Sequence, residues 1–148
     1  PRPRTRLLPL RGGQTEQVRV KFWGVRGSLT TPEPEYADFG GNTPCIEVLL
    51  DGGASLVLDA GMGLRWYNFD RMSRPESGTE YHLLLTNFNW DHIQGLPFSP
   101  MVYIPGNRVH LYGASASGRN MREHLLNQQR LDFCPVPNFL LDGVGAEL

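Results

Sequence analysis

The sequence is poor in cysteine, in lysine and in long apolar segments. Its two cysteines, Cys45 and Cys134, form no Cys-x-x-Cys pair and are too few for a disulfide framework. We therefore expect buried thiols in a reducing, cytoplasmic compartment. No apolar segment approaches the roughly 20 residues that a membrane-spanning helix requires, and the Pro/Arg-rich start is not typical of a secretory signal.

The sequence also lacks an excess of charge of one sign. Fourteen basic and fifteen acidic residues give a net charge of -1, which implies no general attraction to nucleic acid or to an anionic membrane. Nucleic acid is thus not an expected partner, although composition does not exclude it. Thirteen of the basic residues are Arg and one is Lys21. Arg suits phosphate and carboxylate binding, but the scattered positions favour a codon-usage bias over a binding site.

The length of 148 residues and a hydrophobic content of 40% are sufficient for one domain with a core. Residues 1–17, PRPRTRLLPLRGGQTEQ, have no hydrophobic period and predict a flexible arm. Contact between this basic arm and an anionic partner is the alternative. Residues 18–148 are the expected folded domain.

Apolar residues that alternate or run together predict short strands. The expected strands are residues 18–22, 45–50, 55–58, 81–86 and 109–112. The second and third strands are expected to form a hairpin around Asp51-Gly52-Gly53. Val144, Ala146 and Leu148 alternate again and indicate a further strand at the end of the sequence.

Helical segments are fewer. We expect a short helix over Leu64–Met72, a helical turn over residues 93–98 that Pro97 stops, and a helix from an N-cap at Ser117 to about Arg130. Residues 29–43 predict a long loop, a feature that is often functional. Hairpins together with strand–helix units predict a mixed α/β (α+β) fold, with helices on one face of the sheet.

The segment TNFNWDH, Thr86–His92, concentrates the polar residues that can bind a cation. In an extended chain Asn87, Asn89 and Asp91 would point to one side, with His92 just beyond. Asp91 and His92 are suitable zinc ligands, whereas the two amides offer neutral oxygens that suit harder cations. The alternative is a turn held by side-chain to backbone hydrogen bonds.

LLLTNFNWDHIQGLPF, residues 83–98, resembles the first metal motif of the metallo-β-lactamase-fold hydrolases, Thr-His-x-His-x-Asp-His followed by x-x-Gly. The matching residues are Thr86, Asp91, His92 and Gly95. Asn87 and Asn89 occupy the positions of the two His ligands of the family. LVLDAGMG, residues 56–63, resembles the family strand that ends in Asp-x-Gly, which implies that Asp59 and Thr86 support the metal loop without binding the metal.

The resemblance extends over residues 18–148, because FWGVRGSLTTP and FGGNTPC are similar to segments of a branch near the phosphodiesterases and transfer-RNA-processing nucleases. It implies half of a four-layer αββα sandwich, with the remaining metal ligands in a second half beyond residue 148. In the intact family a zinc-bound water attacks a phosphoryl or acyl centre. Asp91 would be a catalytic residue and metal ligand, and His92 a ligand, but two ligands imply weak or no zinc binding.

Three functions remain open, and whether the chain is an enzyme stays open with them. The first is a degenerate, non-catalytic binding or scaffolding domain. The second is a fragment or site-disabled form of an active zinc hydrolase, since His to Asn is a single-base change. The third is an interaction module. His82 and His110 lie in strand patterns and His124 in a helical pattern, so we interpret them as structural.

The resemblance also implies a partner. Half of a sandwich leaves one apolar sheet face without its partner sheet. We expect Leu56, Leu58, Leu83 and Leu85 on that face, and either a homodimer or a separate C-terminal half to cover it.

Overall fold

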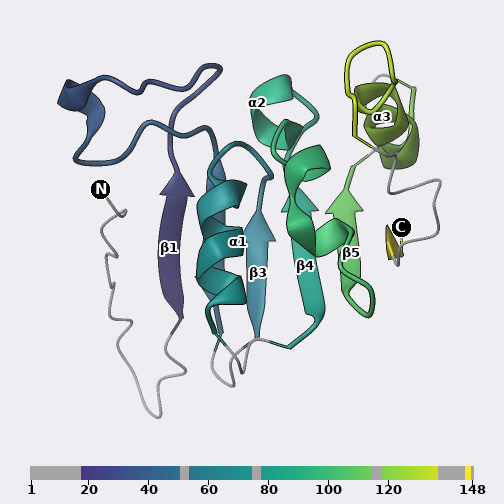
Figure 1. Ribbon diagram of the computed structural model, residues 1–148, viewed down its shortest axis with the longest axis horizontal. Coiled ribbons are helices and arrows are strands. Elements are labelled where there is room, and N and C mark those ends of the chain that lie inside the picture. The colour runs from purple at the N-terminus through teal and green to yellow at the C-terminus, as the bar shows by residue number, and fades with distance from the viewer. Residues whose placement is uncertain (1–17, 51–53, 75–77, 115–117, 137–145, 148) are drawn as a thin grey trace.

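The computed structural model describes residues 18–50, 54–74, 78–114, 118–136 and 146–147. Its strands form one sheet in the order of the sequence, from β1 to β6 (Figure 1). They are β1 (Arg19–Gly24), β2 (Cys45–Leu49), β3 (Ser55–Leu58), β4 (Glu80–Leu85), β5 (Arg108–Gly113) and β6 (Ala146–Glu147). The helices are α1 (Leu64–Met72), α2 (Trp90–Ile93) and α3 (Met121–Gln128), with 3-10 turns η1 (Pro34–Tyr36), η3 (Leu96–Phe98) and η4 (Pro100–Val102).

The sheet is mixed. β1, β2 and β3 pair antiparallel, as successive hairpins require, whereas β3, β4, β5 and β6 pair parallel. Parallel neighbours need a crossover, which α1 provides between β3 and β4. The mixed α/β class predicted from the sequence is therefore confirmed. The predicted β-strand patterns are confirmed as well, although Val144, Leu148 and the arm of residues 1–17 lie outside the described residues.

The helix predictions had mixed outcomes. Leu64–Met72 is confirmed as α1. The N-cap at Ser117 is wrong, because α3 begins after Asn120. Asn120 Oδ1 accepts from the Glu123 N–H at 2.9 Å, and the Glu123 carboxylate accepts from the Asn120 N–H at 2.8 Å. This reciprocal pair satisfies two donors that a helix start leaves without partners, so it determines where the helix begins.

The predicted turn over residues 93–98 is partly wrong. The helical segment begins three residues earlier, with α2 at Trp90, and η3 follows it. Pro97 does not stop a helix but lies in the first residues of η3. Proline is tolerated there because the N–H groups of the first helical residues have no acceptor within the helix.

One face of the sheet carries the core. Leu64 and Tyr67 of α1 are buried together with Val57, Leu83 and Leu111 of the strands. Figure 1 shows α1 and the η3–η4 segment in front of the sheet, while α2 and α3 lie beyond the upper ends of β4 and β5. Successive residues of each strand point alternately to this covered face and to the opposite face of the sheet.

This second face, called here the open face, is apolar over most of its width. Its apolar members are Val20, Phe22, Ile46, Val48, Leu56, Leu58, Leu84 and Tyr112, all exposed or half-buried. The expectation for its composition is wrong in part: Leu83 and Leu85 are buried on the helix-covered face. The reason is the register, which pairs Leu56 with His82 and Leu58 with Leu84.

Candidate functional site

The Thr86–His92 motif lies where two neighbouring parallel strands end. Asp59 directly follows β3 and Thr86 directly follows β4, and these strands pair in register. The Asp59 N–H donates to the Leu84 carbonyl at 2.9 Å, which extends the strand pairing to the site. Clefts at the carboxyl ends of parallel strands are common binding positions, so the fold places the motif where a site is expected.

Asp59 is the centre of the hydrogen-bond network. Its Oδ1 accepts from the Thr86 N–H at 2.8 Å, and the Thr86 hydroxyl lies 2.9 Å from both carboxylate oxygens. The other oxygen, Oδ2, lies 2.9 Å from Nδ1 of His92. Asp59 is buried and has a left-handed backbone with φ of 62°. The carboxylate of this residue with a strained backbone thus joins Thr86 to His92.

The motif does not form the extended segment that alternation would require. The Asn87 Oδ1 accepts from the Asn89 N–H at 2.8 Å, a side-chain turn of the kind that Asn favours. Asn89 then precedes α2, so Asp91 lies in a helical turn. The Asn87 amide nitrogen donates to the Thr86 hydroxyl at 3.3 Å. The Asn87 side chain thus holds the turn at both ends, which favours the turn interpretation over a ligand role.

Asp91 and His92 do come together. Oδ2 of Asp91 lies 3.5 Å from Nε2 of His92, the nitrogen that Asp59 does not contact. The same oxygen accepts from the Ser28 N–H at 2.8 Å. Asp91 is buried and His92 is half-buried. Asp59 therefore orients the His92 ring through Nδ1, as carboxylates do for many metal-binding histidines, and Nε2 faces Asp91.

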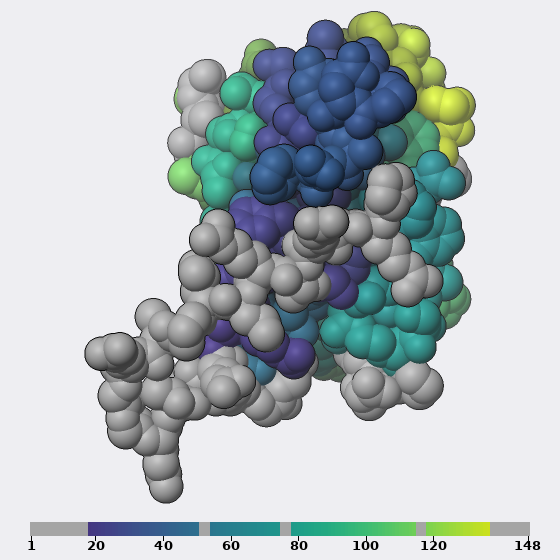
Figure 2. Space-filling model, turned by 90° about the vertical axis from the view of Figure 1, so that its left-hand side faces the viewer, coloured from purple at the N-terminus to yellow at the C-terminus, as the bar shows by residue number. Residues whose placement is uncertain are grey.

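The contact from Ser28 was missed by sequence reasoning; Ser28 lies just before the predicted long loop of residues 29–43. The loop between β1 and β2 lies beyond the upper end of β1 and forms the blue lobe seen from the β1 edge (Figures 1 and 2). Arg26 holds this loop, because its guanidinium donates to the carbonyls of Gly40 and Tyr36 at 2.9 and 3.1 Å. Ser28 has a left-handed backbone with φ of 61°, and its N–H donates to Asp91. No local pattern signals a backbone contact across 63 positions.

Two glycines allow the strand end and the motif to approach each other. A Cβ on Gly61 would lie 2.3 Å from the Asp91 carbonyl oxygen, and one on Gly95 would lie 2.3 Å from the Gly61 carbonyl oxygen. The buried hydroxyl of Thr43 accepts from the Met62 N–H and from the Gln94 side chain, both at 2.8 Å. These contacts fix the spacing between the segment after β3 and the segment after β4.

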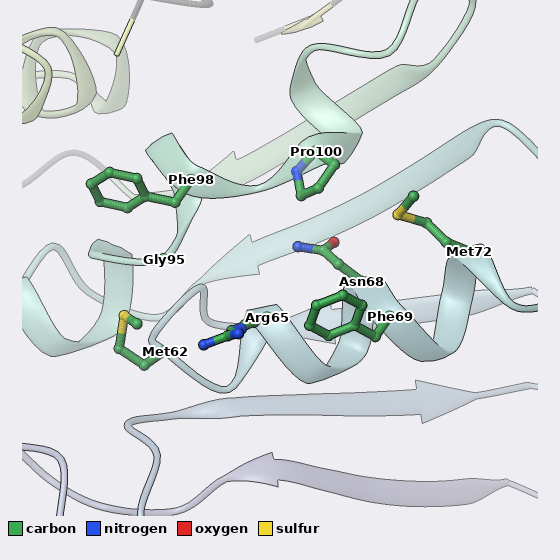
Figure 3. Close-up of a pocket in the computed structure, with 8 residues that line it drawn as sticks. All are labelled: Met62, Arg65, Asn68, Phe69, Met72, Gly95, Phe98 and Pro100. Carbon is green, nitrogen blue, oxygen red and sulfur yellow. The ribbon is translucent and has the colours of Figure 1, made fainter. Parts of the chain in front are cut away.

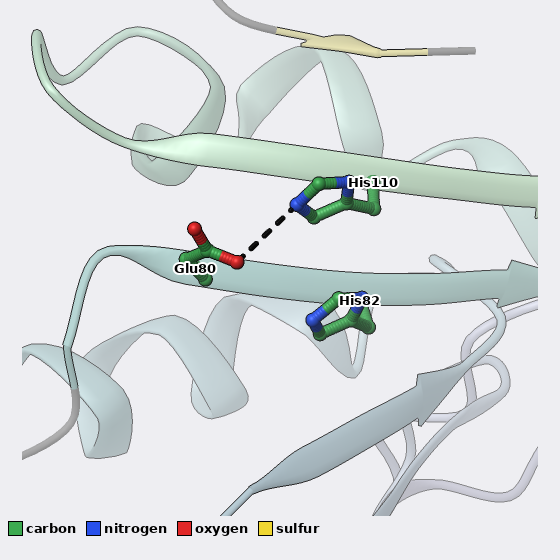
Figure 4. A group of neighbouring side chains, drawn as sticks. All are labelled: Glu80, His82 and His110. Carbon is green, nitrogen blue, oxygen red and sulfur yellow. Dashed lines mark ion pairs between the residues drawn. The ribbon is translucent and has the colours of Figure 1, made fainter.

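The donor set of the motif does not fit a catalytic zinc ion. A catalytic site uses three protein ligands and one water, whereas this motif brings together one carboxylate and one imidazole, from Asp91 and His92. Asn87 is engaged in its turn. Among the described residues, a group of three potential ligands occurs elsewhere, at Glu80, His82 and His110 (Figure 4).

Two hollows lie near the motif but do not contain Asp91 or His92. A pocket of about 330 Å³ separates α1 from the η3–η4 segment (Figure 3). Its lining residues are Met62, Arg65, Asn68, Phe69, Met72, Gly95, Phe98 and Pro100. A wider, open groove of about 750 Å³ lies between α2 and α3, where Phe88 stacks on His124 with ring centroids 4.4 Å apart. His124 thus packs as an aromatic side chain, in line with a structural role.

No protein-family model matches this sequence, and no curated protein matches it significantly. The resemblance to metallo-β-lactamase-fold hydrolases therefore rests on the motif and on the segments beside it. Within the described part of the chain, no helix is long and apolar enough to cross a membrane.

Proposed function

We propose that this chain is a metallo-β-lactamase-like half domain whose metal motif no longer supports catalysis, and that it acts as a binding or scaffolding domain. The observation that carries this proposal is that the motif has its supporting hydrogen bonds but not its full set of metal ligands. The supporting network of Asp59, Thr86 and His92 is complete, whereas Asn87 uses its side chain to close a turn. The scaffold of a metal site is thus retained without enough ligands.

The loss of two imidazoles decides the chemistry. Activation of water by zinc needs an ion held firmly with one position open. Asp91 and His92 supply two ligands, which leaves the ion weakly held and mostly hydrated. The competing proposal is a site-disabled form or fragment of an active zinc hydrolase, for which the resemblance favours a phosphodiester substrate. That proposal draws on the same retained network.

Zinc affinity separates the effect of the two amides from that of the rest of the motif. We would compare the chain with Asn87→His/Asn89→His, both in a His82→Ala/His110→Ala background that removes the other potential ligand group. A chromogenic chelator competing for Zn²⁺ measures the affinity. The double His variant is expected to bind more tightly by more than the roughly 10- to 100-fold that outer-shell partners contribute.

The same proteins would be assayed on a chromogenic phosphodiester. No rapid turnover is expected even with four motif ligands, because the resemblance places the remaining ligands in a second half. Rapid hydrolysis by the double His variant would favour the site-disabled hydrolase. Stoichiometric, tight zinc in the background protein, lost on Asn87→Ala/Asn89→Ala, would refute the non-catalytic proposal.

The exposed apolar residues of the open face support the proposal that the chain acts by associating with another polypeptide. Phe22 and Leu84 are 38% and 36% exposed, and Ile46, Leu56 and Leu58 between them are half-buried. Each 100 Å² of such surface left in water costs about 2.5 kcal/mol. We propose a symmetric homodimer through this face, with a separate second-half polypeptide as the other outcome.

Light scattering of purified protein at micromolar concentration tests this association. We expect a dimer that Leu84→Glu dissociates, because the new charge would be buried in the interface. Met72→Glu is the matched control, since Met72 is 60% exposed on α1, on the other face of the sheet. A monomer that binds no apolar dye would contradict the proposed association.

A further inference from the structure

We propose that Glu80, His82 and His110 form a binding site for a divalent transition metal ion of the zinc type, separate from the Thr86–His92 motif. β4 and β5 pair parallel with His82 directly opposite His110. Glu80 precedes His82 by two residues, so it projects from the same side of β4. Figure 4 shows the three side chains together on the two strands, with helices behind them. The site therefore lies on the open face.

The donor atoms of the three side chains lie close together. One donor atom from each side chain lies within 4.8 Å of the other two, and Nε2 of His110 is 3.4 Å from the Glu80 carboxylate. Tetrahedral zinc with bonds of about 2.0–2.1 Å places its ligand atoms roughly 3.3 Å apart. The widest separation is at most 4.8 Å and must therefore shorten by no more than about 1.5 Å.

We expect rotation of the Glu80 side chain and of one imidazole ring to supply this contraction. The two imidazole rings are stacked, with centroids 4.6 Å apart and an interplanar angle of 10°. In-plane lone pairs of parallel rings do not converge, so at least one ring must turn about its χ2 angle to bind the same ion. The Glu80 side chain is 52% exposed and the His110 side chain 21%. Glu80 can therefore rotate at the surface, whereas His110 is mostly buried and its Nε2 is shielded from solvent, so the larger movement is expected from Glu80.

A hydrogen bond already orients one ligand. Nδ1 of His82 lies 2.9 Å from the Tyr112 hydroxyl. That contact leaves Nε2 of His82 for a metal, as outer-shell partners of metal-binding histidines do. Arg108 competes with a metal ion for Glu80, because its guanidinium lies 3.4 Å from the Glu80 carboxylate. Both partners of this ion pair are more than half exposed, and exposed pairs are weak, so a divalent cation can displace Arg108.

The ligand chemistry indicates the class of ion. Two imidazole nitrogens and one carboxylate oxygen suit Zn²⁺ and related transition ions and do not suit Ca²⁺ or Mg²⁺, which prefer oxygen. Three protein ligands leave a fourth position for water or for a group from a molecule that docks on the open face. The site does not depend on the proposed state of the motif, since none of its residues belongs to the motif, but it lies on the face through which we propose association.

The test uses the full chain with Zn²⁺ alone, titrated calorimetrically, and Co²⁺ as a spectroscopic probe of coordination. One equivalent is expected to bind, with visible absorption bands of low-symmetry Co²⁺. His82→Ala and His110→Ala should each reduce the affinity roughly tenfold or more, and Tyr112→Phe should reduce it less, as loss of an outer-shell contact does. His124→Ala is the matched control and should bind like the original chain. Circular dichroism confirms that each variant is folded.

Two results would overturn this site. One is absence of Zn²⁺ binding by the folded chain. The other is binding that His82→Ala and His110→Ala leave unchanged. If His92→Ala instead abolished that binding, both this site and the proposed non-catalytic state of the motif would be refuted. Absence of all Zn²⁺ binding would contradict this site alone.

Discussion

Replacement of Asp59 by Ala should destabilise the fold at the place where β3 meets the motif. Asp59 accepts from the Thr86 N–H and hydroxyl and pairs with His92, at 2.8 to 2.9 Å. Ala removes the acceptor for all three donors. Because Thr86 is exposed, water replaces part of what is lost. We therefore expect a loss of about 1–3 kcal/mol in the free energy of unfolding, the range for polar groups left without partners.

The backbone of Asp59 allows the hydrogen-bond loss to be separated from strain. Its φ of 62° is costly for Ala, whereas Asp tolerates it better and Gly adopts it freely. Asp59→Gly removes the same hydrogen bonds but relieves the strain. We expect Asp59→Gly to be less destabilising than Asp59→Ala by roughly 1 kcal/mol. Asp59→Asn keeps one acceptor oxygen and should be the mildest of the three changes.

Urea unfolding followed by tryptophan fluorescence and circular dichroism measures these differences. Asp132→Ala is the control, because Asp132 pairs with Arg130 at 2.8 Å in a side chain that is 65% exposed. That exposed pair should contribute at most about 1 kcal/mol. An Asp59→Ala variant as stable as the original chain would show that the network around Thr86 and His92 does not hold the site together.

Two further predictions concern close packing and ionisation. Gly95→Ala places a Cβ 2.3 Å from the Gly61 carbonyl oxygen and should lower stability by about 1–3 kcal/mol in the same assay, as overpacking does; an unchanged midpoint would show that the two segments can separate. Burial, helped by the charges of Glu47 and Asp59, raises the pKa of the Cys45 thiol well above its usual value of about 9. With rising pH the thiol loses its proton in the unfolded chain before it does in the folded chain, so the free energy of unfolding should fall above about pH 9. Native Cys45 should also resist a thiol reagent that labels it in urea. Rapid labelling without urea would contradict this burial.

The local sequence determined most of the secondary structure. Alternating apolar residues predicted the strands, because a half-buried strand requires that period wherever it pairs. The α1 prediction succeeded over Leu64–Met72. The start of α3 was misplaced because several polar residues can cap a helix. Asn120 is the cap because Glu123 lies where its carboxylate can complete the reciprocal pair.

The resemblance to the metallo-β-lactamase-fold motif also implied that Asp59 and Thr86 act together, and the structure joins them by hydrogen bonds. The sequence did not indicate the conformation around Asn87 and Asn89, because the same residues are compatible with an extended segment of metal ligands and with a turn. The choice depends on where the chain can begin α2, and the hydrogen bond from the Asn89 N–H to Asn87 decides for the turn.

Tertiary structure alone decided the two features that depend on register. A strand pattern shows which residues alternate, but not which neighbour each one meets. The parallel pairing of β3 with β4 placed Leu58 beside Leu84 and left Leu83 on the helix-covered face. The pairing of β4 with β5 placed His82 against His110, although 28 positions separate them. Contacts of this kind depend on how whole strands align, which is a property of the packed sheet.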